Sequence, residues 1–293
     1  MATVSVSLLT YNHEKYIEKC IEGIVQQIGN HDLELIWYDD RSIDATVERG
    51  RAKLSQTNII QKLIRPKTNR FSKKIATRID RYEQCSGDYI CLLEGDDFWI
   101  NAEKIQMQIE AIEQTGCEIC FSTAAIVDQD QKFLPELLAD HGDKITVFSP
   151  QQIVDGDGGF MPTGSIVVKR SALERLPNWY FGYLPAGDYP LQVICGAQTG
   201  AVYLPQRTLA YRKHPEQWSA EYERNPTSSK RTIFLLEFIE SLVKLAGENQ
   251  LQHLDFRNII HKYYEQLMLG SPEEEFVIEK QIASVLVAPL FRN

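Results

Sequence analysis

Short apolar runs alternate with amphipathic segments along the first 127 residues of the chain. Between the runs, apolar side chains recur three and four positions apart, as in residues 16–25 and 105–112, which is the spacing of an α-helix. The runs have the length and bulk of buried strands, and they cover residues 4–9, 33–38, 59–64, 89–93 and 118–127. This alternation predicts an α/β fold with a mostly parallel central sheet, flanked by helices and joined by right-handed crossovers.

Several polar residues and one glycine are candidates for the ends of these helices. Asn12 and Asn101 precede amphipathic segments, so we expect each to cap a helix N-terminus. Gly29 follows the first amphipathic segment and is expected to stop it. Ser149-Pro150 has the order of an N-cap followed by proline at the first helical position, which predicts a short helix there.

The second half of the chain is less regular and ends in helical patterns. A strand is predicted at residues 166–168, preceded by a glycine-rich loop. After a polar break near residue 225, amphipathic patterns cover residues 233–243, 256–269 and 273–287. We therefore expect an α/β domain and a helical C-terminal extension, with boundaries at residues 1–224 (halves 1–128 and 129–224) and 225–293.

The composition of the chain argues against several classes of protein. The net charge of −9 argues against a general nucleic-acid binder, which is usually basic. No apolar run has the length of a membrane span, and the N-terminus lacks the basic region of a signal peptide. Six cysteines lie mostly within apolar patterns, as expected for reduced thiols of a cytoplasmic protein. Cys117 and Cys120 form a C-x-x-C, but no second pair completes a zinc site.

Polar residues follow three of the predicted strands at the point where each ends. They lie at residues 10–12, at residues 39–40 and at Glu94, Asp96 and Asp97. Because the carboxyl ends of parallel strands meet at one edge of a sheet, we expect a nucleotide pocket there. Crowded carboxylates repel one another unless a cation offsets them, and oxygen ligands favour Mg²⁺ or Mn²⁺ over zinc. The alternative for the three acids is a surface turn, with Gly95 at positive φ.

Glycine-rich nucleotide motifs are missing from the chain. No G-x-G-x-x-G follows the first strand, which disfavours a dinucleotide-binding fold. No G-x-x-x-x-G-K-[ST] is present, which excludes a P-loop.

Three segments together resemble glycosyltransferase family 2: Val6 to Asn12, Tyr38-Asp39-Asp40-Arg41-Ser42-Ile43-Asp44, and Leu93-Glu94-Gly95-Asp96-Asp97-Phe98-Trp99. The resemblance covers roughly residues 3 to 220. It implies a GT-A fold, with a nucleotide-binding half and an acceptor half. It also implies a nucleotide-sugar donor, a divalent metal and an inverting displacement.

The resemblance also assigns roles to particular residues. Asp40 matches the aspartate that accepts a hydrogen bond from uracil, Asp97 matches a metal ligand, and His214 is expected to reach the metal or the diphosphate. Asp188 is expected to be the catalytic base, with a helix N-cap as its alternative role. The residues expected to bind the nucleotide sugar are Thr10, Tyr11, Asn12, Glu14, Asp39, Asp40, Asn69, Arg78, Glu94, Asp96 and Arg212.

The chain departs from the family pattern at two places. Between the third and fourth strands only Asn69 and Arg78 match the family's Asn-x-Gly and Ala-Arg-Asn residues. Gly187 stands where the family usually has a glutamate before Asp188. The other bases of the stretch are expected to form a solvated helix face, and they are Arg65, Lys67, Arg70, Lys73, Lys74 and Arg81.

We therefore expect a metal-dependent inverting glycosyltransferase that uses a UDP-sugar with Mn²⁺ or Mg²⁺. Its acceptor is expected to be a hydroxyl of a glycan or lipid-linked molecule, as in bacterial surface polysaccharide synthesis. Two alternatives are a sugar nucleotidyltransferase, although its glycine-rich loop is missing, and a non-catalytic nucleotide-sugar-binding protein, because of Gly187. The C-terminal helices are expected to pack on the domain; contact with the inner face of the membrane and homodimer formation are the alternatives.

Overall fold

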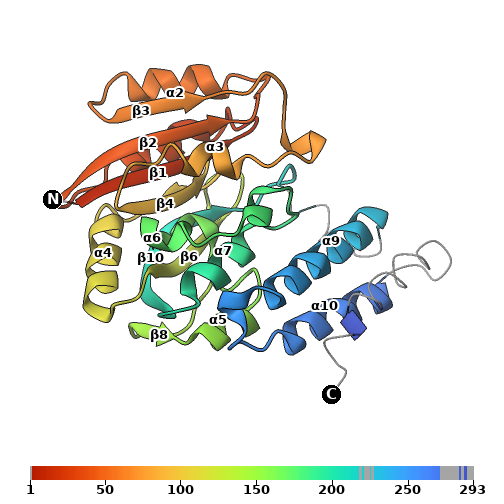
Figure 1. Cartoon of the computed structure of the whole chain (residues 1–293). Helices are drawn as coiled ribbons and strands as arrows, with labels where there is room; N and C mark the ends of the chain where they lie inside the picture. Colours follow the sequence, from red (N-terminus) through yellow and green to blue (C-terminus); the bar gives the residue numbers. More distant parts are fainter. Residues whose placement is uncertain are drawn as a thin grey trace.

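The computed structural model describes residues 2–217 and 228–270, together with residues 220, 225, 284, 287 and 288. The described residues form a ten-stranded sheet in the order β3-β2-β1-β4-β9-β6-β10-β5, with β7 beside β6 and β8 beside β10 (Figure 1). The strands are β1 Ala2–Thr10, β2 His31–Asp39, β3 Ile60–Ile64, β4 Tyr89–Glu94, β5 Phe98–Trp99, β6 Ile119–Val127, β7 Phe133–Leu138, β8 Thr146–Phe148, β9 Val167–Lys169 and β10 Ala201–Arg212.

The sheet is parallel in its first part and mixed in its second. Strands β3, β2, β1 and β4 are parallel neighbours, and β6 and β10 form a second parallel pair. Between them lies β9, antiparallel to both β4 and β6, while β7 returns from β6 through a short hairpin. The α/β fold class is therefore confirmed, but the parallel arrangement is interrupted by β9, and the longest parallel run is β3-β2-β1-β4. Short connections give antiparallel neighbours, and an apolar run does not reveal the direction of its strand.

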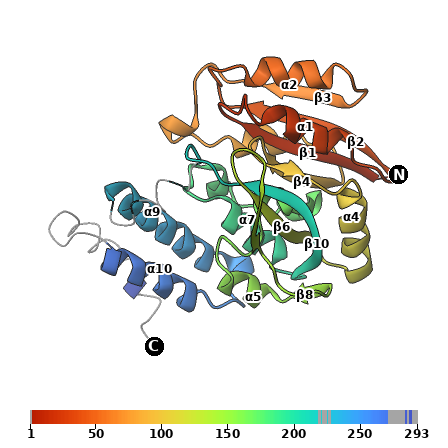
Figure 2. The same cartoon turned by 180° about the vertical axis from the view of Figure 1, so that it is seen from behind.

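Helices cover both faces of this sheet. Viewed from behind, α1 lies across β1 and β2, whereas α3 and α7 lie on the opposite face (Figures 1 and 2). The helices are α1 Ile17–Val25, α2 Thr46–Leu54, α3 Arg78–Tyr82, α4 Lys104–Thr115, α5 Pro150–Asp155, α6 Arg170–Leu173, α7 Asp188–Gly196, α9 Ser229–Ala246 and α10 Arg257–Gly270. Short 3-10 turns are η1 Phe71–Lys73, η2 Thr163–Ser165, η3 Asn178–Phe181 and η4 Asn249–Leu251.

Strand β4 shows why the central runs are apolar without alternation. Ile90 and Leu92 join the hydrophobic cluster on the α7 face, while Cys91 and Leu93 join the cluster beneath α1 and α4. Successive side chains of a strand point to opposite faces, so a strand covered on both sides must be apolar at every position. The run stops where the sheet edge opens to the cleft at Glu94.

The helix ends agree with the sequence only in part. Ser149 caps α5 in a reciprocal capping box with Gln152, and Pro150 is the first helical residue, as predicted. The prediction for Asn12 was wrong, because α1 begins at Ile17 and Asn12 lies in the preceding turn with a φ of 55°. Asn101 lies ahead of α4 in a similar way and accepts from a backbone N–H before that helix begins. Asn side chains hydrogen-bond to nearby backbone in turns as well as at helix caps, so residue type alone does not separate the two.

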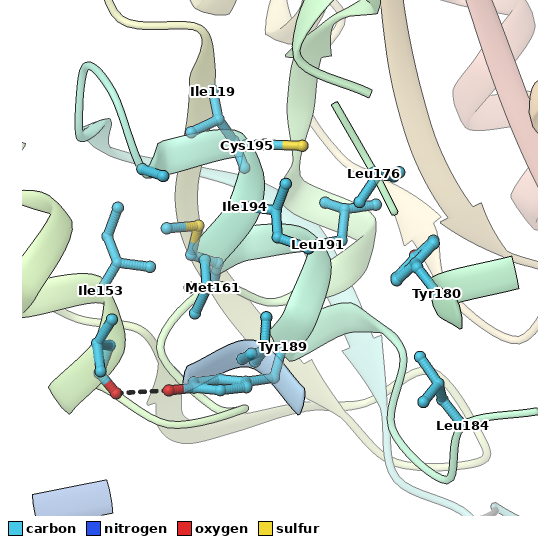
Figure 3. Close-up of a cluster of buried hydrophobic side chains, with 14 of the residues drawn as sticks. Ile119, Ile153, Met161, Leu176, Tyr180, Leu184, Tyr189, Leu191, Ile194 and Cys195 are labelled. Carbon is cyan, nitrogen blue, oxygen red and sulfur yellow. Dashed lines mark hydrogen bonds between the residues drawn. The ribbon is translucent and has the colours of Figure 1, made fainter. Parts of the chain in front are cut away.

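The C-terminal helices pack on the second half of the domain, as expected. Phe238 of α9 lies 5.7 Å from the ring of Tyr189 in α7, and both belong to one hydrophobic cluster. Figure 3 shows this cluster around α7, where the Tyr189 hydroxyl donates to the Val154 carbonyl at 2.7 Å. The helix predicted over residues 273–287 lies outside the described residues. Among the helices that are described, none has the length and apolarity needed to cross a bilayer.

Candidate functional site

The ends of β2, β1 and β4 meet side by side at one edge of the sheet. In register, Thr10 lies opposite Asp39, and Leu9 lies opposite Glu94. Gly95 turns the chain here because of close approach, and the expected positive φ was wrong. A Cβ at Gly95 would lie 2.5 Å from Thr10 Cγ2, so only glycine leaves room for the β1 end.

Asp39 is fully buried and holds the strand ends together. Its Oδ2 accepts from the Thr10 hydroxyl at 3.0 Å and from Ser42 Oγ at 2.5 Å. Its Oδ1 accepts from Ser42 N at 2.9 Å and from Arg65 Nε at 3.0 Å. Arg65 is exposed, as predicted, but it follows β3 and lies on no helix. With these contacts, the Asp39 carboxylate and the Thr10 hydroxyl lie beneath the pocket surface.

Asp40 fastens the segment after β3 to the end of β2. Its Oδ1 accepts from Arg70 N at 2.8 Å and its Oδ2 from Phe71 N at 2.9 Å, while Asn69 Nδ2 donates to the Asp40 carbonyl at 2.9 Å. Burial raises the pKa of Asp40, and the two backbone N–H groups offset part of that effect. Each carboxylate oxygen keeps a second lone pair that a base could use.

The loop after β1 contributes one exposed aromatic side chain and two side chains that brace the loop. Tyr11 is 43% exposed at the pocket. Asn12 Oδ1 accepts from Ile43 N at 3.0 Å, and Glu14 Oε2 accepts from Ala45 N at 3.0 Å. Of the residues expected on the nucleoside side, Tyr11 therefore has the face that is open for stacking.

Asp96 lies between two histidines beyond the end of β4. Its Oδ2 is 3.1 Å from His214 Nε2 and 3.9 Å from His13 Nε2. Burial raises the pKa of Asp96, but the two imidazoles more than offset it and the net shift is downward. The other oxygen, Oδ1, is buried and has no hydrogen-bond partner among the described residues. A buried carboxylate oxygen without a donor is a position that a cation can satisfy.

The neighbouring carboxyl groups are only partly compensated by positive charge. Burial raises the pKa of Asp97 well above its usual range, and the charge of Asp96 adds to this effect, whereas Arg212 opposes it. Burial, followed by the charges of Asp96 and Asp188, raises the pKa of Glu94 to about 8, although this side chain is exposed to solvent. Glu94 therefore lies near both Asp96 and Asp188. Ionising all of these acids together is unfavourable unless a cation is added.

Arg212 lies beneath the acidic loop and shapes it. It is 1% exposed, and its Nε donates to the Asp96 carbonyl at 2.7 Å while its backbone N–H donates to Asp97 Oδ1 at 2.8 Å. Its guanidinium stacks over the ring of Tyr16, with 4.5 Å from Cζ to the ring centroid. These contacts point to positioning of the loop, in place of the phosphate contact expected from the sequence.

Asp188 faces the strand ends from the second half of the domain. It is the first residue of α7, and the N-cap position belongs to Gly187. Its Oδ1 accepts from Tyr189 N at 3.0 Å, and its Oδ2 accepts from the Thr163 hydroxyl at 3.2 Å. Burial raises the pKa of Asp188, whereas the hydrogen bonds and the charge of Arg78 oppose that rise. An acid with a raised pKa beside a cleft is a candidate proton acceptor.

Arg78 occupies the space beside Gly187. Its Nη2 donates to the Gly182 carbonyl at 3.0 Å, and its Cζ lies 5.0 Å from the ring centroid of Tyr180. A Cβ at Gly187 would lie 2.5 Å from Arg78 Nη1. The guanidinium therefore fills the place beside the backbone where the family's glutamate side chain would begin, and it braces the loop that leads to Asp188.

We expect Gly187→Ala to lower the free energy of unfolding by about 1 kcal/mol, because the new methyl group must displace the end of the Arg78 side chain from its contacts. Chemical denaturation measures this cost. In an Arg78→Ala background the same change should cost less than about 0.5 kcal/mol, since nothing is then displaced. Gly158→Ala is the control, because no atom lies within 4 Å of that position. Equal costs of Gly187→Ala in both backgrounds would contradict the packing argument.

Sequence reasoning missed three residues of this site. His13 approaches Asp96, Thr163 holds Asp188, and Arg81 is a buried base whose charge lowers the pKa of Glu94. Arg81 was expected on a solvated face, and that prediction was wrong. The one local signal was the position of His13, three residues past the end of β1. The other two contacts join segments far apart in sequence.

The described residues contain no group of three or more His, Cys, Asp and Glu side chains that could hold a metal ion by themselves. Asp97 and His214, expected to share a metal, instead bond to Arg212 N and to Asp96. The chemistry of the site nevertheless fits a divalent cation, because Asp96 Oδ1 lacks a partner and the carboxylates repel one another. Mg²⁺ is commonly bound by one or two carboxylates together with substrate phosphates.

Comparison with known sequences identifies relatives of this chain. The family model described as glycosyl transferase family 2 matches residues 5–176, more than half of the chain. An uncharacterised protein of Mycobacterium tuberculosis is 24% identical over 233 residues, 75% of this chain and 61% of that relative. The putative glycosyltransferase EpsE of Bacillus subtilis is 31% identical and matches 60% of this chain and 59% of its own length. The chain thus spans about three fifths of these relatives.

The name of a more distant relative specifies a sugar donor and an acceptor. The Escherichia coli UDP-Glc:alpha-D-GlcNAc-diphosphoundecaprenol beta-1,3-glucosyltransferase WfgD is 29% identical over 43% of this chain and 47% of its own length. Among solved structures, S. aureus TarS 1–349 with UDP-GlcNAc has a TM-score of 0.68 at 14% identity, covering 99% of this chain and 79% of that one. The mannosyltransferase PcManGT of Pyrobaculum calidifontis with GDP-Man and Mn²⁺ has a TM-score of 0.56 at 13% identity, covering 99% and 76%. These structures confirm the expected fold.

Proposed function

Since this chain belongs to glycosyl transferase family 2, we propose that it is an inverting glycosyltransferase that moves a sugar from a nucleotide diphosphate to an acceptor hydroxyl. The observation that carries the proposal is that two acidic groups from different halves of the domain lie near each other. Glu94, Asp96 and Asp97 lie at the end of β4, and Asp188 approaches Glu94 from the second half of the domain. The carboxylates at the end of β4 suit the binding of a metal ion and a diphosphate. Asp188 suits the acceptance of a proton.

On the donor side, the proposal assigns the nucleoside to the ends of β1 and β2. Tyr11 offers an exposed ring for stacking against a base, and Asp40 offers a carboxylate to an N–H of that base. Thr10, Asp39, Asn12, Glu14 and Asn69 support this pocket through the contacts already described. TarS, a structural neighbour, was solved with UDP-GlcNAc, which supports a UDP-sugar as the donor.

Asp97 and Asp96 are proposed to hold Mn²⁺ or Mg²⁺ together with the donor diphosphate. Asp96 Oδ1 has no partner within the described part of the chain, and Asp97 uses only its Oδ1 for Arg212 N. His214 fixes the orientation of Asp96 through its other oxygen. A bound divalent cation would offset charge on the departing diphosphate as a Lewis acid. The mannosyltransferase neighbour, solved with Mn²⁺, supports this assignment.

Asp188 is proposed to accept the proton of the acceptor hydroxyl. The acceptor oxygen then forms a bond to the anomeric carbon, while the bond from that carbon to the diphosphate oxygen breaks and the nucleoside diphosphate leaves. Attack from the side opposite the leaving group inverts the anomeric configuration. Thr163 holds one oxygen of Asp188, so that the carboxylate stays directed as the proton transfers.

The proposed acceptor is a glycan or a lipid-linked sugar of a polysaccharide pathway. The similarity to WfgD, whose name specifies a diphosphoundecaprenol acceptor, supports this class. The non-catalytic alternative depended on the missing glutamate at Gly187. Because Arg78 fills that position and Asp188 still faces the cleft, loss of the glutamate does not remove the proposed base. Turnover with a panel of nucleotide sugars would separate catalysis from binding alone.

We expect UDP to bind more tightly than CDP, each measured by calorimetry with Mn²⁺. Uracil can donate an N–H to Asp40, whereas cytosine has no donor at that ring nitrogen and would face the carboxylate without a hydrogen bond, which costs about 1–3 kcal/mol. The purine nucleotide GDP serves as the size control. Equal affinities for UDP and CDP would limit Asp40 to its contacts with Arg70 N and Phe71 N.

A further inference from the structure

One segment of this acidic protein is strongly basic and carries exposed apolar side chains. Residues 65–79, here called the rim segment, contain six Lys and Arg residues and no acid, in a chain with a net charge of −9. Within it Phe71 is 49% exposed, Ile75 47% and Ile79 37%. Single exposed apolar residues are ordinary, but three within nine positions among lysines form an amphipathic surface.

The rim segment lies beside the loop that leads to Asp188 and beside α9. Figure 1 shows η1 projecting beyond the sheet on the side where α9 lies. The Phe71 ring is 6.5 Å from the ring of Tyr183, and Lys74 pairs with Glu237 of α9 at 2.6 Å. Tyr183 belongs to the loop that leads to Asp188. The segment therefore contacts both the end of β2, through Asp40, and the loop of the proposed catalytic base.

Two of the six basic residues of the rim segment are not balanced by an acid. Arg65, Arg70 and Lys74 pair with Asp39, Asp80 and Glu237. Lys67 and Lys73 are exposed, and none of the ion pairs among the described residues includes them. Arg78 donates to backbone carbonyls, and its charge acts on Asp188. Two exposed lysines thus remain in a segment with three exposed apolar side chains.

We propose that the rim segment docks this protein onto an anionic membrane surface. Apolar side chains at the interface and basic side chains near anionic headgroups are each weak signals, and stable peripheral binding needs both. The acidic remainder of the protein is repelled by such a surface, so the rim is the face that can approach it. A nucleic acid would also attract the lysines, but it offers no apolar phase for Phe71 and Ile75.

This docking deepens the proposed function, on which it rests, by naming a membrane-anchored acceptor. With the rim segment at the interface, the loop that leads to Asp188 lies at the level of the headgroups. An acceptor sugar carried on a lipid diphosphate would then reach Asp188 without leaving the membrane. In this proposal residues 65–79 make the membrane contact. The sequence analysis had considered that contact as an alternative role of the C-terminal helices.

Vesicle co-sedimentation of the full chain tests the proposal without any nucleotide sugar. We expect binding to phosphatidylcholine vesicles that contain phosphatidylglycerol, little binding to phosphatidylcholine alone, and loss of binding in high salt. Lys67→Gln/Lys73→Gln should weaken binding by about 30-fold, from about 1 kcal/mol for each lysine. Phe71→Ser/Ile75→Ser should weaken it by roughly tenfold through lost apolar burial. Both variants should retain the circular dichroism spectrum of the parent.

Lys132→Gln/Lys144→Gln is the matched control, because both lysines are exposed and lie outside the rim segment. Its vesicle binding should equal that of the parent. Equal loss in the control and the Lys67/Lys73 variant, or no preference for anionic vesicles, would overturn the proposal. Hydrolysis of the donor UDP-sugar in solution is measured in parallel. If the protein binds vesicles but is inactive, only the proposed enzymatic function fails; if it is active but does not bind, only the docking fails.

Discussion

Asp188→Asn is expected to lower kcat by about 10²–10⁴-fold while leaving the fold and nucleotide binding intact. Asparagine can still accept from Tyr189 N through its amide oxygen, and its amide N–H can donate to the Thr163 hydroxyl oxygen. It cannot take the acceptor proton. Steady-state kinetics with a lipid-linked acceptor and thermal unfolding of both proteins measure the two effects.

The pH dependence of the turnover rate is an independent test of Asp188 as the base. Burial raises the pKa of Asp188, and the group must be ionised to act as a base. The rate of the parent should therefore fall as the pH drops through that raised pKa, and the residual rate of Asp188→Asn should lack this acidic limb. A variant with near-normal turnover and an unchanged limb would reduce Asp188 to a structural group. Glu94 would then be the next candidate for the base, because it lies near Asp188 and its pKa is also raised.

Asp97→Asn is expected to abolish metal-dependent donor binding and to lower turnover by about 10²-fold or more. Lewis-acid stabilisation of the departing diphosphate is worth several kcal/mol, and a neutral amide is a weak metal ligand. The amide oxygen can still accept from Arg212 N, so the loop should keep its conformation. Calorimetry of UDP binding with and without Mn²⁺ measures the coupling.

Unfolding measurements on Asp97→Asn distinguish the loss of the metal site from misfolding of the loop. Because burial and Asp96 raise the pKa of Asp97, its ionised form is disfavoured in the metal-free fold, and a neutral side chain should not lower the unfolding temperature. The parent should gain stability with Mn²⁺ and UDP, by roughly 2.7 kcal/mol at 100 times Kd, and the variant should not. Asp128→Asn is the control, since that carboxylate only accepts turn N–H groups. An unchanged metal response in Asp97→Asn would remove Asp97 from the metal site.

The sequence determined the elements and the edge of the sheet at which chemistry can occur. Apolar runs such as Tyr89 to Leu93 become strands because every side chain is buried on one face or the other, and this depends on local composition. Parallel strands then bring Thr10, Asp39 and Glu94 together without further information. The polar strand ends and the missing glycine-rich loops were sufficient to predict a nucleotide pocket at this edge.

Only the tertiary structure decided which polar side chains remain free. Asp39 and Arg212 have the residue types of ligand-binding groups, yet Asp39 is saturated by Ser42 and Arg65, and Arg212 lies buried beneath Asp96. Those contacts join segments from 3 to 116 positions apart, and a sequence pattern reports only near neighbours. Hydrogen-bond saturation is a property of the packed neighbourhood, so it cannot be read from residue type.

The same reason explains the second half of the site. From the sequence, Gly187 could mean that a catalytic acid is lost. The structure shows instead that Arg78, from α3 more than 100 positions away, fills the space beside Gly187. The direction of β9 and the packing of α9 on α7 likewise follow from which surfaces remained uncovered, because antiparallel insertion and helix docking bury apolar area without a local signature. Local patterns thus determined the strands, the helices and the reactive edge, and long-range packing decided which groups at that edge support the fold and which face the cleft.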